Sequence, residues 1–296
     1  MATIGSDPST TAYAYIGIAV GFVVFAATLG AVFMLLYFGG SFDRMKHEAS
    51  GMPTSADQVK PLLYDDLLQN AASLPLKPAA YSLDGQFVHI RPLESFSDRK
   101  AIVSTLHEIS SGKAISGIYG GKAFDADAAL WRYMLSGPYE TVDDFERGRC
   151  IEADNQRLSV LLDASTSKPI GMVGLLNHSP TDLRVEIGAI WLVPAFQGTG
   201  VHREVVYLLL DALFREGGYR RVEWRCDGFN VRSRKAAHSL GFTMEGVLRK
   251  HMIAKGANRD TVVFAALNGE WPAIQEMLQA KLNAMLAKRP HKPKDD

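Results

Sequence analysis

The stretch from Glu186 to Phe214 constrains the fold more than any other part of the chain, because it reads as a strand, a glycine loop and a helix in direct succession. Residues 185 to 193 predict a buried strand, and the spacing of apolar residues from 205 to 214 predicts a helix that ends at Gly217. The glycines at 198 and 200 allow unusual φ values and a close approach of the backbone to a ligand. The loop delivers free N–H groups to a helix N-terminus, and such a site attracts an anion, usually phosphate.

The loop matches neither of the two commonest glycine-rich nucleotide-binding patterns. It lacks the Lys-Ser/Thr pair that follows the last glycine of a P-loop, and it lacks the three-glycine spacing of a dinucleotide-binding turn. A Gly-x-Gly turn before a helix also arises from turn chemistry alone. Taken by itself, the loop therefore indicates either an anion site or a plain turn.

The charge balance of the chain argues against nucleic acid as its main partner. The 296 residues include 32 Lys plus Arg and 32 Asp plus Glu, whereas a nucleic-acid-binding domain is expected to be basic. Cys150 and Cys226 show neither metal-ligand spacing nor a disulfide framework. We therefore expect a reducing compartment and no metal.

Residues 12 to 38 contain no charged side chain. A helix of that length spans a hydrocarbon core of about 30 Å, so the stretch predicts a single-pass transmembrane helix with the lipid bilayer as a partner. A cleaved signal peptide and a buried helix are the alternatives. A signal peptide would need a basic region, but Asp7 is the one charged side chain before the stretch. A buried helix of this length would need an unusually large core. Arg44 and Lys46 follow, which places the C-terminal side in the cytosol.

The rest of the chain divides into a linker, a globular domain and a tail. Scattered prolines and charges predict a linker over residues 39 to 80, after a short tail of residues 1 to 11 and the membrane stretch. We expect helices at 97–109, 125–133, 142–155, 201–216, 231–240 and 272–286, and strands at 87–91, 158–162, 170–176, 185–193, 221–226, 242–251 and 261–267. This order predicts an α/β (α+β) domain over residues 81 to 272, with helices on both faces of a mixed sheet, and a C-terminal helix and charged tail over residues 273 to 296.

The loop and the segments around it resemble the GNAT superfamily of N-acetyltransferases. The acetyl-CoA loop of that family reads Arg or Gln, two variable residues, Gly, one variable residue, and then Gly or Ala. Gln197 and Gly200 match this pattern, whereas His202 stands where Gly or Ala is usual. The imidazole of His202 either crowds the pyrophosphate or adds a hydrogen-bond donor to it, and the sequence leaves both open.

A second set of residues is similar to the ribosomal-protein N-acetyltransferase-like branch of the superfamily. It comprises Trp131, Tyr133, Gly137, Pro138, Glu204, Asn230, Ser233, Gly241, Phe242, Glu245 and Gly246. The resemblance covers residues 85 to 272, and it implies a GNAT-type, mostly antiparallel twisted sheet. It does not include the predicted transmembrane helix, the linker or the tail.

The resemblance also implies acetyl-CoA as co-substrate. The end of the strand would contact the pantetheine arm, the loop and the start of the helix would hold the pyrophosphate, and Asn230 on a later helix would contact the arm as well. The strand and loop positions are Ile190, Trp191, Leu192, Val193, Gln197, Gly198, Thr199, Gly200, Val201, His202 and Arg203.

The chemistry needs further groups. The resemblance implies that Ser233 protonates the departing CoA thiolate, directly or through water. Trp131 and Tyr133 either line the acceptor pocket or are core aromatics. A lysine-type amine has a pKa of about 10.4 and is mostly protonated at neutral pH, so transfer also needs a base. Our candidate is Glu186 on the central strand, and a structural carboxylate is the alternative role for it.

These expectations combine into a membrane-anchored N-acetyltransferase that moves acetyl directly from acetyl-CoA to a primary amine, with no covalent enzyme intermediate. The alternative is a degenerate domain that binds CoA, or nothing, and serves as an interaction module. His202 is its main support. The acceptor is either a protein or a small molecule, because the segments expected to form its pocket, residues 110–140 and 177–184, name no substrate.

Overall fold

The structure, a computed structural model, describes residues 67–68, 71 and 74–288. The predicted transmembrane stretch, residues 12 to 38, and most of the predicted linker lie outside these residues. Within the part of the chain that is described, no helix is long and apolar enough to cross a membrane.

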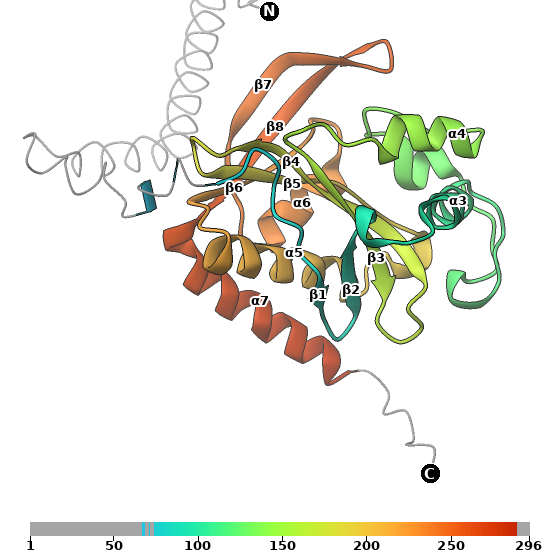
Figure 1. Cartoon of the computed structure of the whole chain (residues 1–296), viewed down its shortest axis with the longest axis horizontal. Helices are drawn as coiled ribbons and strands as arrows, with labels where there is room; N and C mark the ends of the chain where they lie inside the picture. Colours follow the sequence, from blue (N-terminus) through green and yellow to red (C-terminus); the bar gives the residue numbers. More distant parts are fainter. Residues whose placement is uncertain (1–66, 69–70, 72–73, 289–296) are drawn as a thin grey trace, which may run out of the picture. The chain divides into compact units, whose positions relative to one another are not determined.

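The domain is built on one mixed sheet (Figure 1). The described strands are β1 (Leu83–Asp84), β2 (Val88–Pro92), β3 (Arg157–Asp163), β4 (Pro169–Ser179), β5 (Arg184–Leu192), β6 (Arg221–Asp227), β7 (Thr243–Ala254) and β8 (Ala257–Leu267). Their order across the sheet is β1-β2-β3-β4-β5-β6-β8-β7. Of these described pairs, β5 with β6 is parallel and all others are antiparallel, which confirms the mostly antiparallel sheet.

Helices cover both sides of this sheet. Figure 1 shows α5 and α7 together on one side and α3 and α4 gathered on the other. The helices are α3 (Arg99–Ser110), α4 (Val142–Phe145), α5 (Val201–Asp211), α6 (Val231–Ser239) and α7 (Trp271–Leu286). Short π-type turns are η4 (Asp127–Trp131), η5 (Glu146–Cys150) and η7 (Ala212–Glu216), and short 3-10 turns are η2 (Leu93–Ser95), η3 (Gly117–Tyr119), η6 (Pro194–Phe196) and η8 (Asn268–Glu270).

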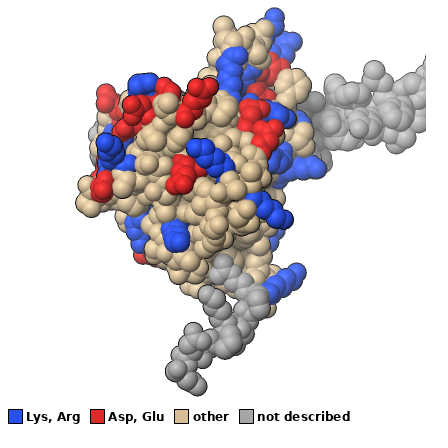
Figure 2. All heavy atoms as spheres, turned by 90° about the vertical axis from the view of Figure 1, so that its right-hand side faces the viewer, with Lys and Arg blue, Asp and Glu red and all other residues tan. Residues whose placement is uncertain are grey.

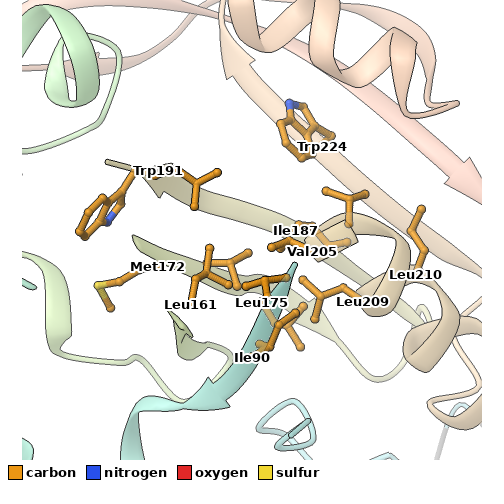
Figure 3. Packing of buried hydrophobic residues seen from close by; sticks show 14 of the residues in the cluster. Ile90, Leu161, Met172, Leu175, Ile187, Trp191, Val205, Leu209, Leu210 and Trp224 are labelled. Atoms are coloured by element: carbon orange, nitrogen blue, oxygen red, sulfur yellow. The ribbon is translucent and has the colours of Figure 1, made fainter. Parts of the chain in front are cut away.

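The main core lies between the sheet and α5. Figure 3 shows Ile90 of β2, Leu175 of β4 and Ile187 of β5 pointing toward Val205 and Leu209 of α5, and all five side chains are buried. A buried aliphatic side chain stabilises the fold by about 1.5–3 kcal/mol. This packing therefore fixes α5, and with it the loop that precedes α5, against the central strand.

Most predicted elements occur within a few residues of their expected bounds, but the helix predicted over residues 142 to 155 is too long. The helix formed by α4 and η5 ends at Cys150. Ile151 is extended and exposed, and the Glu152 carboxylate accepts a hydrogen bond from the backbone N–H of Leu158 at 2.6 Å. The chain thus turns back into β3 as soon as its apolar side chains stop facing the core.

Glu204, near the start of α5, ties this helix to the beginning of the sheet. Its carboxylate accepts hydrogen bonds from the backbone N–H groups of Gln86, Phe87 and Val88 at 2.7, 2.6 and 2.9 Å. The side chain is 5% exposed. Charge-assisted bonds of this kind are stronger than neutral ones, so Glu204 is a structural residue that positions the helix start.

Both ends of the described region pack onto the domain. The apolar face of α7 is buried through Ile274, Leu278 and Leu282, and α7 lies against α5. At the other end, the carbonyl groups of Leu76 and Pro78 bond to side chains of β4 and β3. The last residues of the predicted linker are therefore held by the sheet.

Candidate active site

The central feature of the site is a gap between the two parallel strands. β5 and β6 pair at only three positions, from Arg184 with Arg221 to Glu186 with Glu223. Beyond Glu186, β5 continues through Leu192 beside β4 with no partner on its β6 side among the described strands. An unpaired strand edge offers backbone N–H and C=O groups to a ligand.

A β-bulge on β5 shapes the same gap. Gly188 pairs with Gly174 and Trp191 pairs with Met172, so two residues of β5 oppose one of β4. The extra residue lets Ala189 adopt a φ of 52°, which is uncommon for a residue with a side chain. Bulges re-aim side chains and often lie next to active sites. Here the bulge turns Trp191 toward the aromatic ring of Trp131, 5.8 Å away.

A cavity of about 580 Å³ lies at the gap, lined by residues of β5, β6, η4, the loop before α5, and α6. Of the residues predicted for the site, those that line it are Glu186, Ile190, Trp191, Leu192, Gln197, Gly198, Thr199, His202, Arg203, Asn230, Ser233 and Tyr133. The predicted residues that do not line it are Val193, Gly200, Val201 and Trp131. Segments far apart in the sequence thus converge on one hollow.

At one end of the cavity, the N-terminus of α5 is free to bind an anion. No side chain caps this helix, and Gly198 takes a φ of 74° in the loop before it. A Cβ on Gly198 would meet open space, so this glycine is required by its φ value. Uncapped N–H groups at a helix start favour negative charge, and this end therefore fits the pyrophosphate of a CoA molecule.

Position 200 requires glycine for a different reason than the sequence suggests. Its φ is −63°, an ordinary helical value, so the expected unusual φ occurs at Gly198 and not at Gly200. A Cβ on Gly200 would come within 2.7 Å of the buried Phe87 ring. Gly200 therefore allows close packing of the helix start on β2, and Val201 beside it is buried in the same contact.

Arg203 has a polar atom that the described protein does not satisfy. Its Nε–H is buried without a hydrogen-bond partner among the described residues, and its Nη1 lies 2.6 Å from the thioether sulfur of Met285. Sulfur is a weak acceptor. A guanidinium left in this way next to an uncapped helix start suits a phosphate group.

His202 points toward the sheet. Its ring stands edge-on to Trp224, with 5.7 Å between ring centres. Burial, and then the charge of Arg203, lower the pKa of His202 to about 4. The imidazole is therefore neutral at physiological pH.

On the other side of the gap, Asn230 and Ser233 begin α6. Asn230 caps the helix, because its Oδ1 accepts the N–H of Ser233 at 3.0 Å. The Ser233 hydroxyl oxygen accepts the indole N–H of Trp224 at 2.9 Å. That bond orients the hydroxyl so that its proton faces the Cys226 sulfur, which also lines the cavity; burial raises the pKa of that thiol, and a hydrogen bond with Ser233 acts to lower it.

The β5 positions differ in what their backbones offer. The N–H of Val193 already donates to Ile170 of β4 at 3.0 Å, and Val193 lines a separate hollow of about 370 Å³. The carbonyl of Leu192 accepts Gln197 Nε2 at 2.9 Å, which holds the loop against the strand. Gln197 in turn lies 3.5 Å from Arg232 of α6, which bridges the gap.

Glu186 lies at the point where β5 and β6 separate, and it is 6% exposed. Burial raises the pKa of Glu186 from 4.5 to about 7, although a hydrogen bond from Asn177 at 2.7 Å and the charge of Arg225 at 3.6 Å both favour its ionised form. A carboxyl with a pKa near the working pH is suited to accept and release a proton.

The two predicted acceptor-pocket aromatics have different positions. Tyr133 lines the cavity. Trp131 is 1% exposed, donates its indole N–H to the Ser110 carbonyl at 3.1 Å, and packs edge-on against Tyr139 and Phe145. Trp131 is therefore part of the core behind the pocket wall.

Sequence reasoning missed several polar residues that the fold brings to the cavity. Asn177, Arg225 and Arg259 lie around Glu186, and the Arg149 guanidinium donates to the Ala189 carbonyl in the bulge. They come from four separate segments, and each reads as an ordinary surface residue in its own neighbourhood. Only β6 gave a local signal of a charged site, because its alternation puts Arg221, Glu223 and Arg225 on one face.

Comparison with known proteins agrees with this geometry. Residues 119–243 match the acetyltransferase (GNAT) domain family. The chain is 31% identical over 152 residues to an uncharacterized N-acetyltransferase, p20, of Bacillus licheniformis, which corresponds to 49% of this chain and 84% of that protein. It is 27% identical over 136 residues to the probable N-acetyltransferase YjcK of Bacillus subtilis strain 168, 46% of this chain and 74% of that protein.

A solved structure shows the same architecture. A GCN5-related N-acetyltransferase from Brucella melitensis superposes with a TM-score of 0.61 and 30% identity, over 69% of this chain and 86% of that one. The fold, the cavity and these relatives define an acetyl-CoA-dependent acyltransferase. The chain belongs to the GNAT family of N-acetyltransferases.

Proposed function

We propose that this protein is a membrane-anchored enzyme that transfers acetyl from acetyl-CoA to a primary amine by direct attack. One observation carries the proposal: a single cavity connects an uncapped helix N-terminus to a buried carboxyl whose pKa is about 7. The first feature holds the CoA phosphates, and the second receives the proton of the amine.

Glu186 acts first, as the base. The acceptor enters as an ammonium ion, and the Glu186 carboxylate takes one proton from it, directly or through a water molecule. The freed lone pair attacks the thioester carbon, so that a C–N bond forms while the C=O π electrons move to oxygen. N–H groups on the open edge of β5 stabilise this oxyanion.

Ser233 acts when the intermediate collapses. The oxyanion re-forms C=O, the C–S bond breaks, and the thiolate of CoA takes a proton from the Ser233 hydroxyl, which regains one from solvent or from the amide nitrogen. The hydrogen bond that Ser233 accepts from the Trp224 indole holds the hydroxyl group at the N-terminal end of α6. Burial raises the pKa of Cys226, the cysteine that lines the cavity, so a neutral thiol there supports direct transfer over a covalent enzyme intermediate.

Two further parts of the proposal rest on sequence. The uncharged stretch 12–38, followed by Arg44 and Lys46, supports a single-pass anchor with the enzyme domain in the cytosol. The residues from Asn230 to Gly246 support the ribosomal-protein N-acetyltransferase-like branch, and thus a protein amine as one possible class of acceptor.

The test is calorimetric titration of acetyl-CoA into the full-length protein, followed by thiol release in the presence of primary amines. We expect saturable binding at one site per chain and CoA release that depends on the amine. Binding without release under any condition would leave the degenerate module as the remaining alternative. Partition of the protein into the membrane fraction, and its loss when residues 12–38 are deleted, tests the anchor.

A further inference from the structure

The cavity holds more positive charge than its own carboxylates neutralise. Six arginines line it: Arg132, Arg149, Arg203, Arg225, Arg232 and Arg259. Among the described lining residues, two carboxylates oppose them, Glu186 and Asp227. With Glu186 ionised, a formal excess of four charges remains among the lining residues, and two of these are neutralised from outside the lining, because Arg132 pairs with Asp127 and Arg225 with Glu223. The CoA phosphates suit Arg203 at the loop, but they do not explain the arginines around Glu186.

Among these six arginines, Arg149 most clearly lacks a counter-ion. Burial lowers the pKa of its guanidinium, and none of the described carboxylates lies within 4.0 Å of it. Its Nη2 donates to the Ala189 carbonyl, while its Nε–H is buried with no acceptor among the described residues. A buried guanidinium stays charged and is unfavourable without a counter-ion. An incoming anion would relieve both the unpaired charge and the unsatisfied donor.

Arg259 of β8 has the same kind of unsatisfied Nε–H as Arg149, whereas Arg225 does not. The Arg259 side chain is 11% exposed, and its buried Nε has no hydrogen-bond partner among the described residues; the nearest carboxylate, Asp227, is 3.8 Å away. Arg225 already bonds to Glu223 at 2.7 Å. Two guanidinium groups with an unsatisfied Nε–H therefore line the cavity, Arg259 within electrostatic range of Glu186 and Arg149 at the Ala189 carbonyl of the bulge.

The position of Arg149 relates it to the acceptor and not to the co-substrate. Its partner Ala189 lies in the β5 bulge, three residues beyond Glu186, whereas the anion-binding loop lies beyond the end of the strand. A molecule whose amine reaches Glu186 can thus place a second group near Arg149. On the face seen in Figure 2, acidic and basic side chains are interspersed, and no uniformly basic surface is formed.

From this arrangement we infer that the acceptor amine also carries a carboxylate, which Arg149 binds while Glu186 takes the proton of the amine. The inference rests on the proposed N-acetyl transfer and names its substrate class: amino carboxylates, free or at the end of an acidic peptide. A guanidinium matches the planar carboxylate in two-point hydrogen bonding. A polyamine would bring more positive charge into a cavity that already has an excess.

The experiment compares acceptors that differ only at the group distant from the amine. Thiol release by the full-length protein is measured with a series of ω-amino carboxylates of increasing chain length, the matching primary amides, the matching diamines and the matching phosphonates. We expect kcat/KM to be at least tenfold higher for the best carboxylate than for its amide, and lowest for the diamine. Equal rates for carboxylate and amide, or a preference for the diamine, overturn the inference and leave the acetyltransferase assignment intact. A preference for the phosphonate overturns the choice of carboxylate.

Two variants assign the effect to one residue. Arg149→Gln is expected to lower kcat/KM for the carboxylate by about 10- to 100-fold, as for the loss of a charge-assisted hydrogen bond, with little change for the amide. Arg147→Gln is the matched control, because Arg147 lies on the same turn, is 67% exposed and pairs with Asp144. An equal loss in both variants, or an equal loss for carboxylate and amide, argues against a contact from Arg149.

A binding measurement keeps the inference testable without turnover. The N-acetylated ω-amino carboxylate and its amide are titrated into the protein saturated with CoA. The carboxylate is expected to bind at least tenfold more tightly, and Arg149→Gln to remove the difference. If acetyl-CoA binds but no amine is acetylated, the proposed function fails, while this titration still decides whether the cavity selects a carboxylate.

Discussion

The two ends of the cavity bind in different ways. The CoA end is made of backbone: an uncapped helix start, a glycine at positive φ and an open strand edge, all from the contiguous stretch between β5 and α5. The acceptor end is made of side chains, Glu186, Asn177, Arg149 and Arg259, from separate elements. Backbone geometry suits a co-substrate that the whole family shares, whereas side chains can change one at a time. We therefore expect the acceptor end to determine the specificity of this enzyme.

Removing the base should produce the largest effect and should affect the acceptor end alone. Glu186→Gln is expected to lower kcat by about 10²- to 10⁴-fold, the usual contribution of a general base, with acetyl-CoA affinity unchanged. The parent enzyme should gain activity as pH rises through about 7, because Glu186 is protonated below that pKa. This acid limb should be absent from the residual activity of the variant.

Stability separates this catalytic role from a structural one. The folded-state pKa of Glu186 is raised from 4.5 to about 7, so its ionisation costs more in the folded protein than in the unfolded chain. Its contribution to stability is therefore lost as pH rises through that window. Glu186→Gln should be at least as stable as the parent at pH 8 in chemical denaturation. A marked loss of stability there would indicate a structural carboxylate.

The next largest effect is expected from a substitution at the CoA end of the cavity. Arg203→Gln removes a guanidinium whose Nε has no partner among the described residues. We expect acetyl-CoA to bind about 10- to 100-fold more weakly, and dephospho- and full-length CoA analogues to be affected alike if the contact is to the pyrophosphate. Arg215→Gln is a suitable control, because this exposed arginine lies at the far end of the same helical segment. An unchanged affinity would restrict the CoA end to backbone contacts.

A substitution of Glu204 should affect the two ends of the cavity equally, because this residue is structural. Glu204→Gln keeps the shape of the side chain but weakens three bonds to the backbone of residues 86 to 88. We expect a loss of about 1–3 kcal/mol in the free energy of unfolding, as for a buried charge-assisted network. Acetyl-CoA affinity and kcat of the folded fraction should change little. A selective loss of CoA binding would show that Glu204 acts on the loop itself.

The smallest effect is expected at His202, the departure from the family loop pattern. Its imidazole is neutral above a pKa of about 4 and packs against Trp224. It therefore adds no charge to the phosphate site between pH 6 and 8. Acetyl-CoA affinity should not depend on His202 titration in that range, and His202→Gly should change affinity by less than about threefold, because the neutral ring faces Trp224 and adds no charge to the phosphate site. A larger gain would show that the ring crowds the pyrophosphate.

The sequence located most of the residues that line the loop end of the cavity but not Asn177, Arg149 or Arg225 at the other end, for a physical reason. A strand, a glycine loop and a helix start are consecutive in the chain, so their periodicity and turn chemistry are visible locally. Ser233 and Asn230 could be found for the same reason, since both lie at one helix start. The role of Gly200 was not visible, because it depends on Phe87 more than a hundred residues away.

The acceptor end depends on sheet register, which the sequence does not show. Arg149 reaches the cavity at the Ala189 carbonyl of the β5 bulge, and Arg259 comes near Glu186 from the β7–β8 hairpin. Trp131 is the opposite case, a predicted pocket residue that does not line the cavity. Its match to the family motif suggested a substrate contact, but three aromatic neighbours place it in the core. Motif position alone does not tell which side of a pocket wall a residue faces.

The short pairing between β5 and β6 has a consequence for solubility. A strand edge with unpaired N–H and C=O groups is normally a hazard, because it recruits strands from other molecules and promotes aggregation. Here the unpaired part of β5 lies between β4 and the cavity, and Arg232 of α6 hydrogen-bonds to Gln197 and to the Ala128 carbonyl at that cavity. We expect this bridge to keep the strands of other proteins from the edge while a narrow acyl-thioester arm still enters. The open edge would then serve the co-substrate without promoting aggregation.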